Sequence, residues 1–432
     1  ILILALFLRM GAFFSFSPWE ETIEKEFVLH ADANLYHNLA IKILDHHYPF
    51  SDRVSPGFPF LLAMIYSVFG VNTWVVLLLN VLLNILCIFS VYKISQKLFG
   101  CKIAIISSSL LALDIHQIIF TQTLLTDTSF SLLIVLSFLL IIKNIKEQRL
   151  IYLFICGITL ALAVLFRPIG VYFYIFVVLF IFLSSKDVIR SKLIRSFTFL
   201  AGYFLILTPI IVINYVNFDH FGVSRLGGLN FLYVNAMSVY EIQGKKSHEE
   251  SIQIVDGRVK DSGGDSIVNP NEKEQLYYSV GMQIIKENFY SYLVNHINGS
   301  INIYTSLSTY NIARIFGEQT KLLSENFFGY PTYLQIDSFI AKKPPLILVV
   351  GFILVLVMFI QYTGVAFGVY RLIKKKKLFE FTLLVLPIIY LTLVTGVVGN
   401  ARFKLPITPF YLVFSAYGIY SLFEKKKKKI GD

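Results

Sequence analysis

The sequence DTSFSLLIVLSFLLIIKNIKEQRLIYLFICGITLALAVLFRPIG, residues 127–170, contains two long apolar runs joined by a short basic turn. The runs, at 125–142 and 150–166, are each long enough to cross the hydrocarbon core of a membrane as a helix. The turn between them holds three cations, Lys143, Lys146 and Arg149. Because positive charge resists translocation, we expect this turn in the cytoplasm. The far ends of the hairpin, at Asp127 and Arg167, then lie on the extracytoplasmic side.

The composition of the whole chain agrees with a membrane protein. Of its 432 residues, 56% are hydrophobic and 15% are charged, against about 45–50% and about 25% in soluble domains. The net charge of +11 comes largely from lysines beside apolar runs, so it reports topology and does not indicate a nucleic-acid partner. Disordered and collagen-like chains are excluded as well. The three cysteines, Cys87, Cys101 and Cys156, have neither metal nor disulfide spacing, and we expect them to be packing residues.

Ten apolar runs predict about ten membrane-spanning helices. They lie at 1–16, 73–92, 103–119, 125–142, 150–166, 169–185, 197–216, 345–370, 379–397 and 405–423. Five short basic segments, near residues 93–102, 143–149, 186–195, 371–377 and 425–429, hold 20 of the 38 Lys and Arg residues. The positive-inside rule places all five in the cytoplasm. The chain begins at Ile1, already within an apolar run, so we expect the first hydrophobic segment to begin upstream. The sequence predicts an all-α polytopic membrane protein.

Two extracytoplasmic segments are much longer than the other connections. The first, at 17–72, contains two stretches with helical periodicity, at 31–44 and 60–70, which we expect to lie at the membrane surface. The second, at 217–344, is expected to be mainly helical, with a mobile polar stretch at about 243–275. We therefore expect an N-terminal transmembrane module at 1–216 whose catalytic first loop is 17–72, an extracytoplasmic region at 217–344, and a C-terminal transmembrane module at 345–432 with a basic cytoplasmic tail.

The predicted spans are nearly free of charge, which favours an enzyme over a transporter, because transporters tend to carry ionisable groups near mid-membrane. The ionisable residues near the apolar runs lie instead at their extracytoplasmic ends. They are Arg9, Asp32, Asp114, His116, Asp127, Arg167, Arg402 and Lys404. Carboxylates can activate an acceptor or hold a divalent ion, while Arg and Lys can bind a phosphate whose lipid tail stays in the membrane. The pattern favours lipid-phosphate chemistry.

The acidic candidates also have structural interpretations. Asp32, in HADANLYHNLA, and Asp127, in TLLTDTSFSLL, both stand at the start of a predicted helix, where aspartate is a good N-terminal cap. Asp114 and His116, in LALDIHQ, could bind a metal or a sugar, or could simply lie in a solvated hairpin. The histidines of the first loop lack the spacing of a metal motif such as HExxH.

The basic candidates are equally open to two interpretations. Arg167, in LFRPIG, is either an arginine that extends to the membrane interface or an anion ligand. Arg402 and Lys404, in GNARFKLPITPF, are either interfacial anchors or ligands that bind a phosphate from the opposite side of the site.

The order of several motifs resembles a known superfamily. They are an apolar first span, HADANLY, SPGFPFLLAMIYSVFG, LLTDTSF, LFRPIG, GGLNF and NARFKLPITPFYLVFSAYGIYSL. This order is similar to that of the GT-C superfamily of polyprenyl-phosphate-sugar-dependent glycosyltransferases, above all to bacterial relatives of the protein O-mannosyltransferases and of the lipid A aminoarabinose transferase. The resemblance runs along nearly the whole chain and is strongest in 1–185 and 395–423. It implies a GT-C-like helix bundle and an integral-membrane glycosyltransferase.

The resemblance also implies roles for particular residues. Asp32 matches the first-loop acidic residue that acts as the catalytic base or orients the acceptor. Asp127 falls where relatives carry a second acidic residue, commonly Glu. Arg9, Arg167 and Arg402 match cations near the site that bind the donor phosphate or support the acidic residues.

Further expectations follow from the same comparison. We expect Lys404 to join the arginines on the donor phosphate, and Tyr36 and Asn230 to lie in substrate-facing loops. Some GT-C enzymes use a divalent cation and others do not, so Mg²⁺ or Mn²⁺ held by Asp32 and Asp127 stays open. Many protein mannosyltransferases have an Asp-Glu pair in the first loop. Here Asp32 is followed by Ala33, which argues against a protein mannosyltransferase in the narrow sense.

The function expected from these observations is inverting transfer of a sugar from a polyprenyl-phosphate donor to an extracytoplasmic lipid, glycan or protein, in the inner membrane of a bacterium. Two alternatives are weighed against it. A flippase or transporter of lipid-linked sugars would need polar helices lining a passage, and the predicted spans are too apolar for that. An O-antigen-type polymerase or ligase also has many spans and a large outer loop, but the ADANLY loop directly after the first span argues against it.

Overall fold

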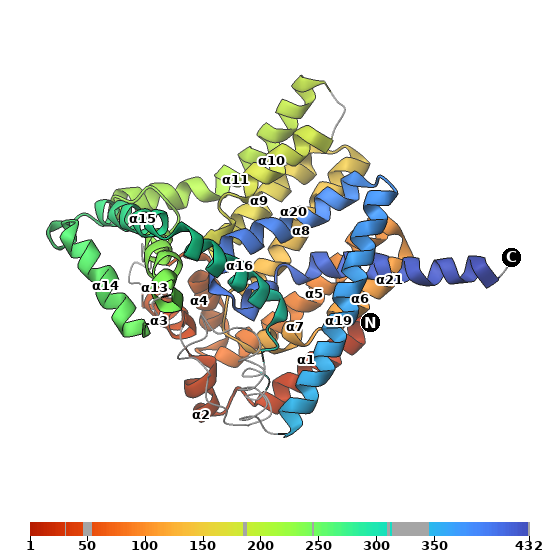
Figure 1. The fold of residues 1–432 in the computed structure, drawn as a ribbon, viewed down its shortest axis with the longest axis horizontal. Helices are drawn as coiled ribbons and strands as arrows, with labels where there is room; N and C mark the ends of the chain where they lie inside the picture. Colours follow the sequence, from red (N-terminus) through yellow and green to blue (C-terminus); the bar gives the residue numbers. More distant parts are fainter. Residues whose placement is uncertain are drawn as a thin grey trace.

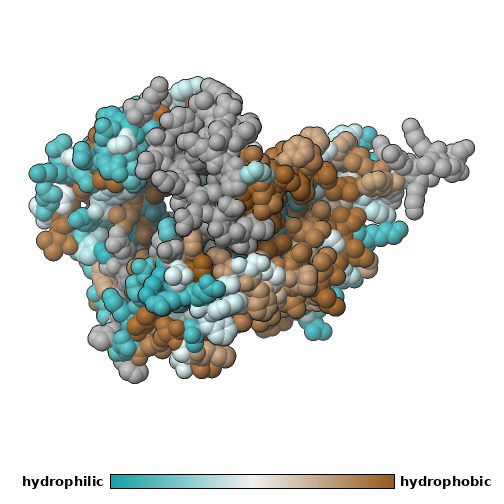
Figure 2. All heavy atoms as spheres, turned by 90° about the horizontal axis from the view of Figure 1, so that it is seen from below, coloured by the Kyte–Doolittle hydropathy of each residue, from teal (hydrophilic) through white to brown (hydrophobic). Residues whose placement is uncertain are grey.

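The computed structural model describes residues 1–30, 32–45, 54–184, 188–243, 246–308, 312 and 345–430, and these residues form helices and turns without a strand. A bundle of long helices occupies the centre and right of Figure 1, and α13, α14 and α15 project together at its left. Figure 2 shows the corresponding surface, in which hydrophobic side chains gather over the bundle and hydrophilic ones over the projecting end. The predicted all-α polytopic membrane fold is confirmed.

The predicted spans all fall on helices. The helices of the bundle are α1 (Leu2–Phe16), α5 (Thr73–Phe99), α6 (Cys101–Ala112), α7 (Ile115–Ile119), α8 (Asp127–Glu147), α9 (Leu150–Phe166), α10 (Phe173–Ser184), α11 (Ile189–Phe218), α19 (Pro345–Lys374), α20 (Leu378–Thr395) and α21 (Thr408–Ile430). Among the described residues, five helices are long and apolar enough to cross a membrane: α5, α8, α11, α19 and α20, the last extended to Val398. The shorter apolar helices include α1 and α9.

The third predicted span is not one straight helix. The expected run at 103–119 is divided between α6 and α7, which meet at an angle of 55°. The break follows from Asp114, whose carboxylate accepts a hydrogen bond from the Gln117 backbone N–H and so begins a new helix. The hairpin around Asp114 and His116 is also buried, with 6% and 2% of each residue exposed. The interpretation as a solvated hairpin is therefore wrong.

Small residues let neighbouring helices of the bundle approach closely. At the contact of α9 with α11, a Cβ added to Gly157 would lie 2.1 Å from the Phe199 carbonyl oxygen, and one on Gly202 would lie 2.1 Å from that of Phe154. Without a hydrophobic driving force between helices in lipid, close backbone contact of this kind is a main source of stability. It fixes α9, and with it the residue that follows α9, Arg167.

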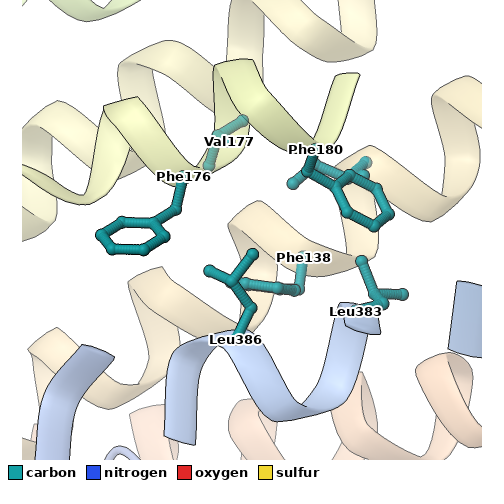
Figure 3. Close-up of a pocket in the computed structure, with 7 residues that line it drawn as sticks. Phe138, Phe176, Val177, Phe180, Leu383 and Leu386 are labelled. Carbon is teal, nitrogen blue, oxygen red and sulfur yellow. The ribbon is translucent and has the colours of Figure 1, made fainter. Parts of the chain in front are cut away.

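The interior of the bundle is closely packed. Figure 3 shows side chains of α8, α10 and α20 converging on an apolar gap, among them Phe138, Phe176, Phe180, Leu383 and Leu386. The gap has a volume of about 10 Å³, which is close to the least that holds one water molecule. This space is too small and too apolar to be the functional site.

The remaining described helices lie outside the bundle, in the two segments that the sequence predicts to be extracytoplasmic. They are α2 (Glu21–Ile23), α3 (Asp32–Leu44), α4 (Gly57–Phe69), α12 (Leu226–Asn230), α13 (Ser238–Gln243), α14 (His248–Asp261), α15 (Pro270–Glu287) and α16 (Phe289–Thr305). The two helices expected in the first loop are present as α3 and α4, which pack against each other. His46 and His47 lie outside the described residues, as does most of 309–344.

The polar stretch at 243–275, for which mobility was expected, is largely helical in the part that the structure describes. It contains α14 and the start of α15. Ser247 and Glu250 form a reciprocal capping box at the start of α14, and Val255 and Val259 bury the apolar side of that helix against α15 and its neighbours. The capping box and the buried valines stabilise a helix in a stretch whose average composition is polar.

Candidate functional site

Four ionisable side chains from distant parts of the sequence meet at one end of the bundle. Arg402 joins two carboxylates, because its Nε donates a hydrogen bond to Asp127 Oδ2 at 2.6 Å and its Nη1 donates one to Asp32 Oδ2 at 2.9 Å. Arg167 Nη1 donates to the other oxygen of the Asp127 carboxylate. We refer to Asp32, Asp127, Arg167 and Arg402 as the ionic cluster.

The fold positions each member of the ionic cluster at the end of an element. Asp32 and Asp127 are the first residues of α3 and α8, and Arg167 ends α9 just before the 3₁₀ turn Pro168–Gly170. Arg402 lies in a second 3₁₀ turn, Ala401–Lys404, whose start is capped by Asn400 Oδ1, which accepts from the Arg402 backbone N–H at 2.9 Å. The hairpin of α8 and α9 thus brings the expected pair Asp127 and Arg167 together.

The two carboxylates differ in their access to water. The Asp127 side chain is 1% exposed and is held by both arginines, whereas the Asp32 side chain is 56% exposed and is held by Arg402 alone. Asp32 Oδ1 carries no hydrogen bond from any described residue. Asp127 is therefore a buried anchor, and Asp32 is the carboxylate that another molecule can reach.

The guanidinium groups are fixed charges. Burial alone would lower the pKa of Arg402, but the neighbouring carboxylates of Asp127 and Asp32 raise that pKa above its ordinary value, so the side chain stays protonated. The Arg167 guanidinium lies 5.0 Å from the ring centre of Phe403 and 5.8 Å from that of Phe130. These aromatic faces support its charge and its orientation.

Tyr36 adds a neutral hydroxyl to the ionic cluster. It lies one helical turn after Asp32 and interacts electrostatically with all four members of the cluster. Burial raises the pKa of its phenol, so the group is a hydrogen-bond donor at neutral pH. Its ring packs edge-on against Phe58 of α4, with 5.2 Å between centroids.

Helix capping does not account for the position of Asp127. The N-cap of α8 is Thr126, and the Asp127 carboxylate is occupied by the two arginines. A residue that served only as a cap would leave both arginines without a buried counter-ion. The structure thus shows Asp127 as the buried counter-ion of two arginines, and its part in catalysis stays a prediction.

Arg9 does not join the ionic cluster, contrary to the role in donor binding expected from sequence. It is fully buried within α1, where Nε donates to Asn84 Oδ1 at 2.7 Å and Nη1 donates to the carbonyl oxygens of Ala5 and Ala112 at 3.1 and 3.0 Å. The neutral acceptors use its donors and close it off from water. Arg9 is a structural residue of the bundle.

The contacts of Arg9 continue as a chain of buried hydrogen bonds toward the ionic cluster. Asn84 Nδ2 donates to Gln117 Oε1 at 2.7 Å, and Gln117 Nε2 donates to the carbonyl oxygen of Leu405 at 2.9 Å. Leu405 directly follows the turn that carries Arg402. The buried relay, as we call Arg9, Asn84 and Gln117, therefore holds the backbone beneath Arg402.

Sequence reasoning missed Asn84 and Gln117. The signal that could have found them is a pair of asparagines, Asn80 and Asn84, one turn apart in the otherwise apolar run LLLNVLLNIL. A polar residue in the middle of a predicted span faces the bundle interior and needs a partner.

Lys404 also lies apart from the ionic cluster, although it is two residues from Arg402. Its side chain is buried, and its electrostatic partner is Asp114. Burial lowers the pKa of the Lys404 ammonium to about 8. His116 lies beside the same aspartate, with 3.9 Å between Nδ1 and Asp114 Oδ1, and its Nε2 is 3.1 Å from the Ser306 carbonyl oxygen. The prediction that Lys404 and Arg402 bind one phosphate together is not supported by this arrangement.

Asn230 is the remaining candidate. It ends α12, is exposed, and its carbonyl oxygen accepts from Asn235 Nδ2 at 3.0 Å. No interaction links Asn230 with the ionic cluster among the residues that the structure describes. Its assignment to a substrate-facing loop stays a prediction.

The ionic cluster does not fit the divalent cation that the sequence left open. Mg²⁺ and Mn²⁺ prefer oxygen ligands, and the two carboxylates here already share the Arg402 guanidinium. Within the described ranges, no group of three or more His, Cys, Asp or Glu side chains is placed to hold a metal ion. The donor set is thus two carboxylates facing two fixed cations.

Comparison with known sequences gives one family match. Residues 53–215 match the family described as dolichyl-phosphate-mannose-protein mannosyltransferase. This range includes Asp127 and Arg167 and ends before Arg402. A search of curated protein sequences finds no significant match.

Comparison with solved structures finds an archaeal enzyme. The oligosaccharyltransferase AglB from Archaeoglobus fulgidus, in complex with an inhibitory peptide and a dolichol-phosphate, is similar with a TM-score of 0.53 and 15% identity over 98% of this chain and 50% of that one. Its apo form gives a TM-score of 0.54 and 13% identity over 98% and 51%. This chain thus spans about half the length of that enzyme, and at these identities the likeness is one of fold.

ArnT from Cupriavidus metallidurans in the apo state is a more distant neighbour. It matches with a TM-score of 0.34 and 11% identity over 89% of this chain and 72% of that one. A score at this level does not establish a common fold.

Proposed function

We propose that this chain is a glycosyltransferase of the GT-C superfamily, which transfers a sugar from a polyprenyl-phosphate donor to an acceptor at the extracytoplasmic face of a membrane. The match of residues 53–215 to a mannosyltransferase family and the likeness of fold support the superfamily expected from sequence. The observation that carries the proposed activity is the ionic cluster, in which a water-accessible carboxylate lies beside two fixed guanidinium groups.

The two arginines are suited to bind the donor phosphate. Arg402 donates from Nε and Nη1 to the carboxylates, and Arg167 donates from Nη1. The Nη2 groups of both arginines donate no hydrogen bond to a described residue. A guanidinium group binds phosphate oxygens with a planar pair of donors. The polyprenyl tail would remain among the lipids beside the bundle. The family name, dolichyl-phosphate-mannose-protein mannosyltransferase, supports a donor of this monophosphate class.

Asp32 is suited to activate the acceptor. Its free Oδ1 accepts the proton of an acceptor hydroxyl or amine as the nucleophile attacks the anomeric carbon. The bond from the anomeric carbon to the phosphate oxygen breaks on the opposite face, so the configuration of the sugar inverts. The leaving polyprenyl phosphate keeps the electron pair, and the nearby arginines stabilise its added charge. Asp32 then returns its proton to water, which reaches this side chain.

The other parts of the ionic cluster support these two roles. Asp127 holds both arginines at one buried carboxylate. Tyr36 places a neutral donor within the same group, where it can bind a sugar hydroxyl or a phosphate oxygen. The acceptor would be a lipid, a glycan or a protein. The expected cytoplasmic location of the basic segments supports a reaction on the extracytoplasmic side, and the membrane we propose is the inner membrane of a bacterium.

The decisive test is transfer from a panel of labelled polyprenyl-phosphate sugars to membrane extracts by the purified protein in lipid nanodiscs. We expect wild type to transfer label from one donor, and Asp32→Asn to reduce transfer by about 10²–10⁴-fold with normal protein yield. Asp45→Asn is the matched control, because Asp45 is an exposed carboxylate just beyond the same helix.

Two results would contradict the proposal. If Asp32→Asn transferred sugar at the wild-type rate, Asp32 would not be the base. If wild type transferred no sugar from any donor but moved lipid-linked sugar between the leaflets of a vesicle, the protein would be a flippase.

A further inference from the structure

We propose that Arg402 is a built-in cation, whose guanidinium takes the place between Asp32 and Asp127 that a divalent metal ion would need, so that the reaction proceeds without a metal. This inference rests on the proposed glycosyl transfer. It identifies the group that supplies positive charge at the reaction site. Its starting point is geometric, since one planar group donates to both carboxylates, at 2.6 Å and 2.9 Å.

The charge balance of the ionic cluster supports this role. Two carboxylates and two guanidinium groups leave the cluster formally neutral. A divalent ion bound to the same carboxylates would add two positive charges beside two arginines that are largely buried, with 18% and 11% of their side chains exposed. Like charges at such short range repel strongly where water is scarce. A metal would therefore have to displace Arg402 before it could bridge the two carboxylates.

Arg402 is also held too firmly to be displaced easily. Its Nε is anchored to Asp127, which is 1% exposed. The turn that carries it is capped by Asn400 and fixed by Gln117 at the Leu405 carbonyl oxygen. A surface arginine would lose side-chain entropy on forming such a bridge, whereas here the surrounding contacts have already ordered the side chain.

The chemistry needs a fixed positive charge at this place. When the bond to the sugar breaks, the phosphate gains a negative charge, and a preorganised donor beside it lowers the barrier. Arg402 can give an unused N–H to that phosphate while Nε stays on Asp127. A metal ion would supply the same charge as a Lewis acid, but three of the four carboxylate oxygens already accept a hydrogen bond from an arginine.

The first experiment measures metal binding without any reaction. Wild type in phosphatidylcholine nanodiscs is titrated with Mn²⁺, and free Mn²⁺ is followed by its electron paramagnetic resonance signal. We expect no stoichiometric loss of free Mn²⁺ in wild type, and the same result for Asp32→Asn. Stoichiometric Mn²⁺ binding by wild type that is lost in Asp32→Asn would overturn the proposal.

The second experiment uses transfer as the readout. Wild-type activity should change by less than about twofold in excess EDTA, while Arg402→Ala should lose about 10²–10³-fold, the usual effect of removing one donor to a developing charge. Added methylguanidinium, which can occupy the space left by the side chain, should raise the transfer rate of Arg402→Ala by at least about tenfold. Arg258→Ala is the control, because Arg258 forms a surface ion pair with Glu287, away from the ionic cluster.

Arg402→Lys is a second variant that tests the same proposal if Arg402→Ala does not fold. Lysine keeps the charge but is a point donor that cannot span both carboxylates as a planar fork, so we expect activity between those of wild type and the alanine variant, again insensitive to EDTA. Transfer that stops in EDTA and returns with Mn²⁺ would refute the built-in cation and leave the glycosyltransferase intact. An absence of transfer from every donor, with or without metal, would instead count against the proposed function.

Discussion

The ionic cluster and the buried relay are linked through the turn at Ala401–Lys404, and both contain an arginine within an apolar bundle. The two arginines differ in their partners and in their access to water. In the relay, Arg9 meets the neutral oxygens of Asn84, Ala5 and Ala112 and is sealed from water. In the cluster, Arg402 meets two carboxylates, one of which is more than half exposed. The comparison teaches that a functional arginine is recognised by unused donors and access to water, rather than by its distance from the end of a span.

The largest effect should come from the buried carboxylate. Asp127→Asn leaves two largely buried arginines without a full counter-ion, and we expect the free energy of unfolding to fall by about 3–5 kcal/mol. The measurement is the thermal midpoint and the yield of monodisperse protein in detergent. Asp32→Asn is the comparison, and for this exposed partner we expect less than about 1 kcal/mol. Equal losses in the two variants would show that the cluster has no buried anchor.

A pH effect of up to about 3 kcal/mol should come from Lys404. Burial lowers its pKa to about 8 in the folded protein, below the ordinary value of 10.5. Between these two values the unfolded chain binds more protons, so stability rises with pH across this window. We expect the wild-type thermal midpoint to rise relative to that of Lys404→Met as pH increases from 8 to 10.5.

The same variant tests whether Lys404 binds the donor. Because Lys404 lies apart from the ionic cluster, we expect Lys404→Met to change the donor KM by less than about threefold, which corresponds to less than about 0.7 kcal/mol. A tenfold rise in the donor KM of a normally folded variant would show that Lys404 binds the donor, as the sequence predicted.

A smaller effect, on stability rather than on donor binding, is expected at Arg9. Arg9→Met leaves Asn84 Oδ1 and the Ala112 carbonyl oxygen without their donors, at a cost of about 1–3 kcal/mol. The donor KM should stay within about twofold of wild type, as measured by initial rates in nanodiscs. If the donor KM instead rose tenfold in stable protein, Arg9 would be a phosphate ligand. The distinction between a donor-binding ionic cluster and a structural buried relay would then be wrong.

A moderate effect on turnover should come from interrupting the buried relay. Asn84→Ala removes the link between Arg9 and Gln117, so the turn that carries Arg402 should be held less well. We expect kcat to fall about tenfold, or about 1.4 kcal/mol, with little change in KM. Asn80→Ala is the matched control, because Asn80 lies one turn away on α5 and donates to the Thr123 carbonyl oxygen instead. Equal losses of kcat in the two variants would argue against the relay.

The sequence alone predicted much of the fold and part of the site. Long apolar runs and basic turns reveal spans directly, because the membrane imposes their length and charge. The hairpin from Asp127 to Arg167 followed from this logic, since its ends must share a side. Helix ends were less predictable, and α11 begins at Ile189, well before the apolar run at 197–216.

Which cations belong together could not be predicted in the same way. Arg9, Arg402 and Lys404 all stand near predicted span ends, so hydropathy treats them alike. The partner of each cation depends on the direction in which its side chain points from the helix or turn. Arg402 and Lys404 leave the same 3₁₀ turn toward Asp127 and Asp114 respectively. Such directions depend on packing between distant helices, which one sequence does not reveal.

The position of Arg402 near the end of the chain has a consequence for biogenesis. During membrane insertion the hairpin of α8 and α9 is complete long before residue 402 is synthesised, and Arg167 already neutralises Asp127 within it. The hairpin can thus enter the membrane without an unpaired buried charge. Arg402 reaches Asp32, 370 residues away in the chain, only when the last helices have been placed. A chain that stops before residue 402 would therefore lack the cation that joins the two carboxylates of the ionic cluster.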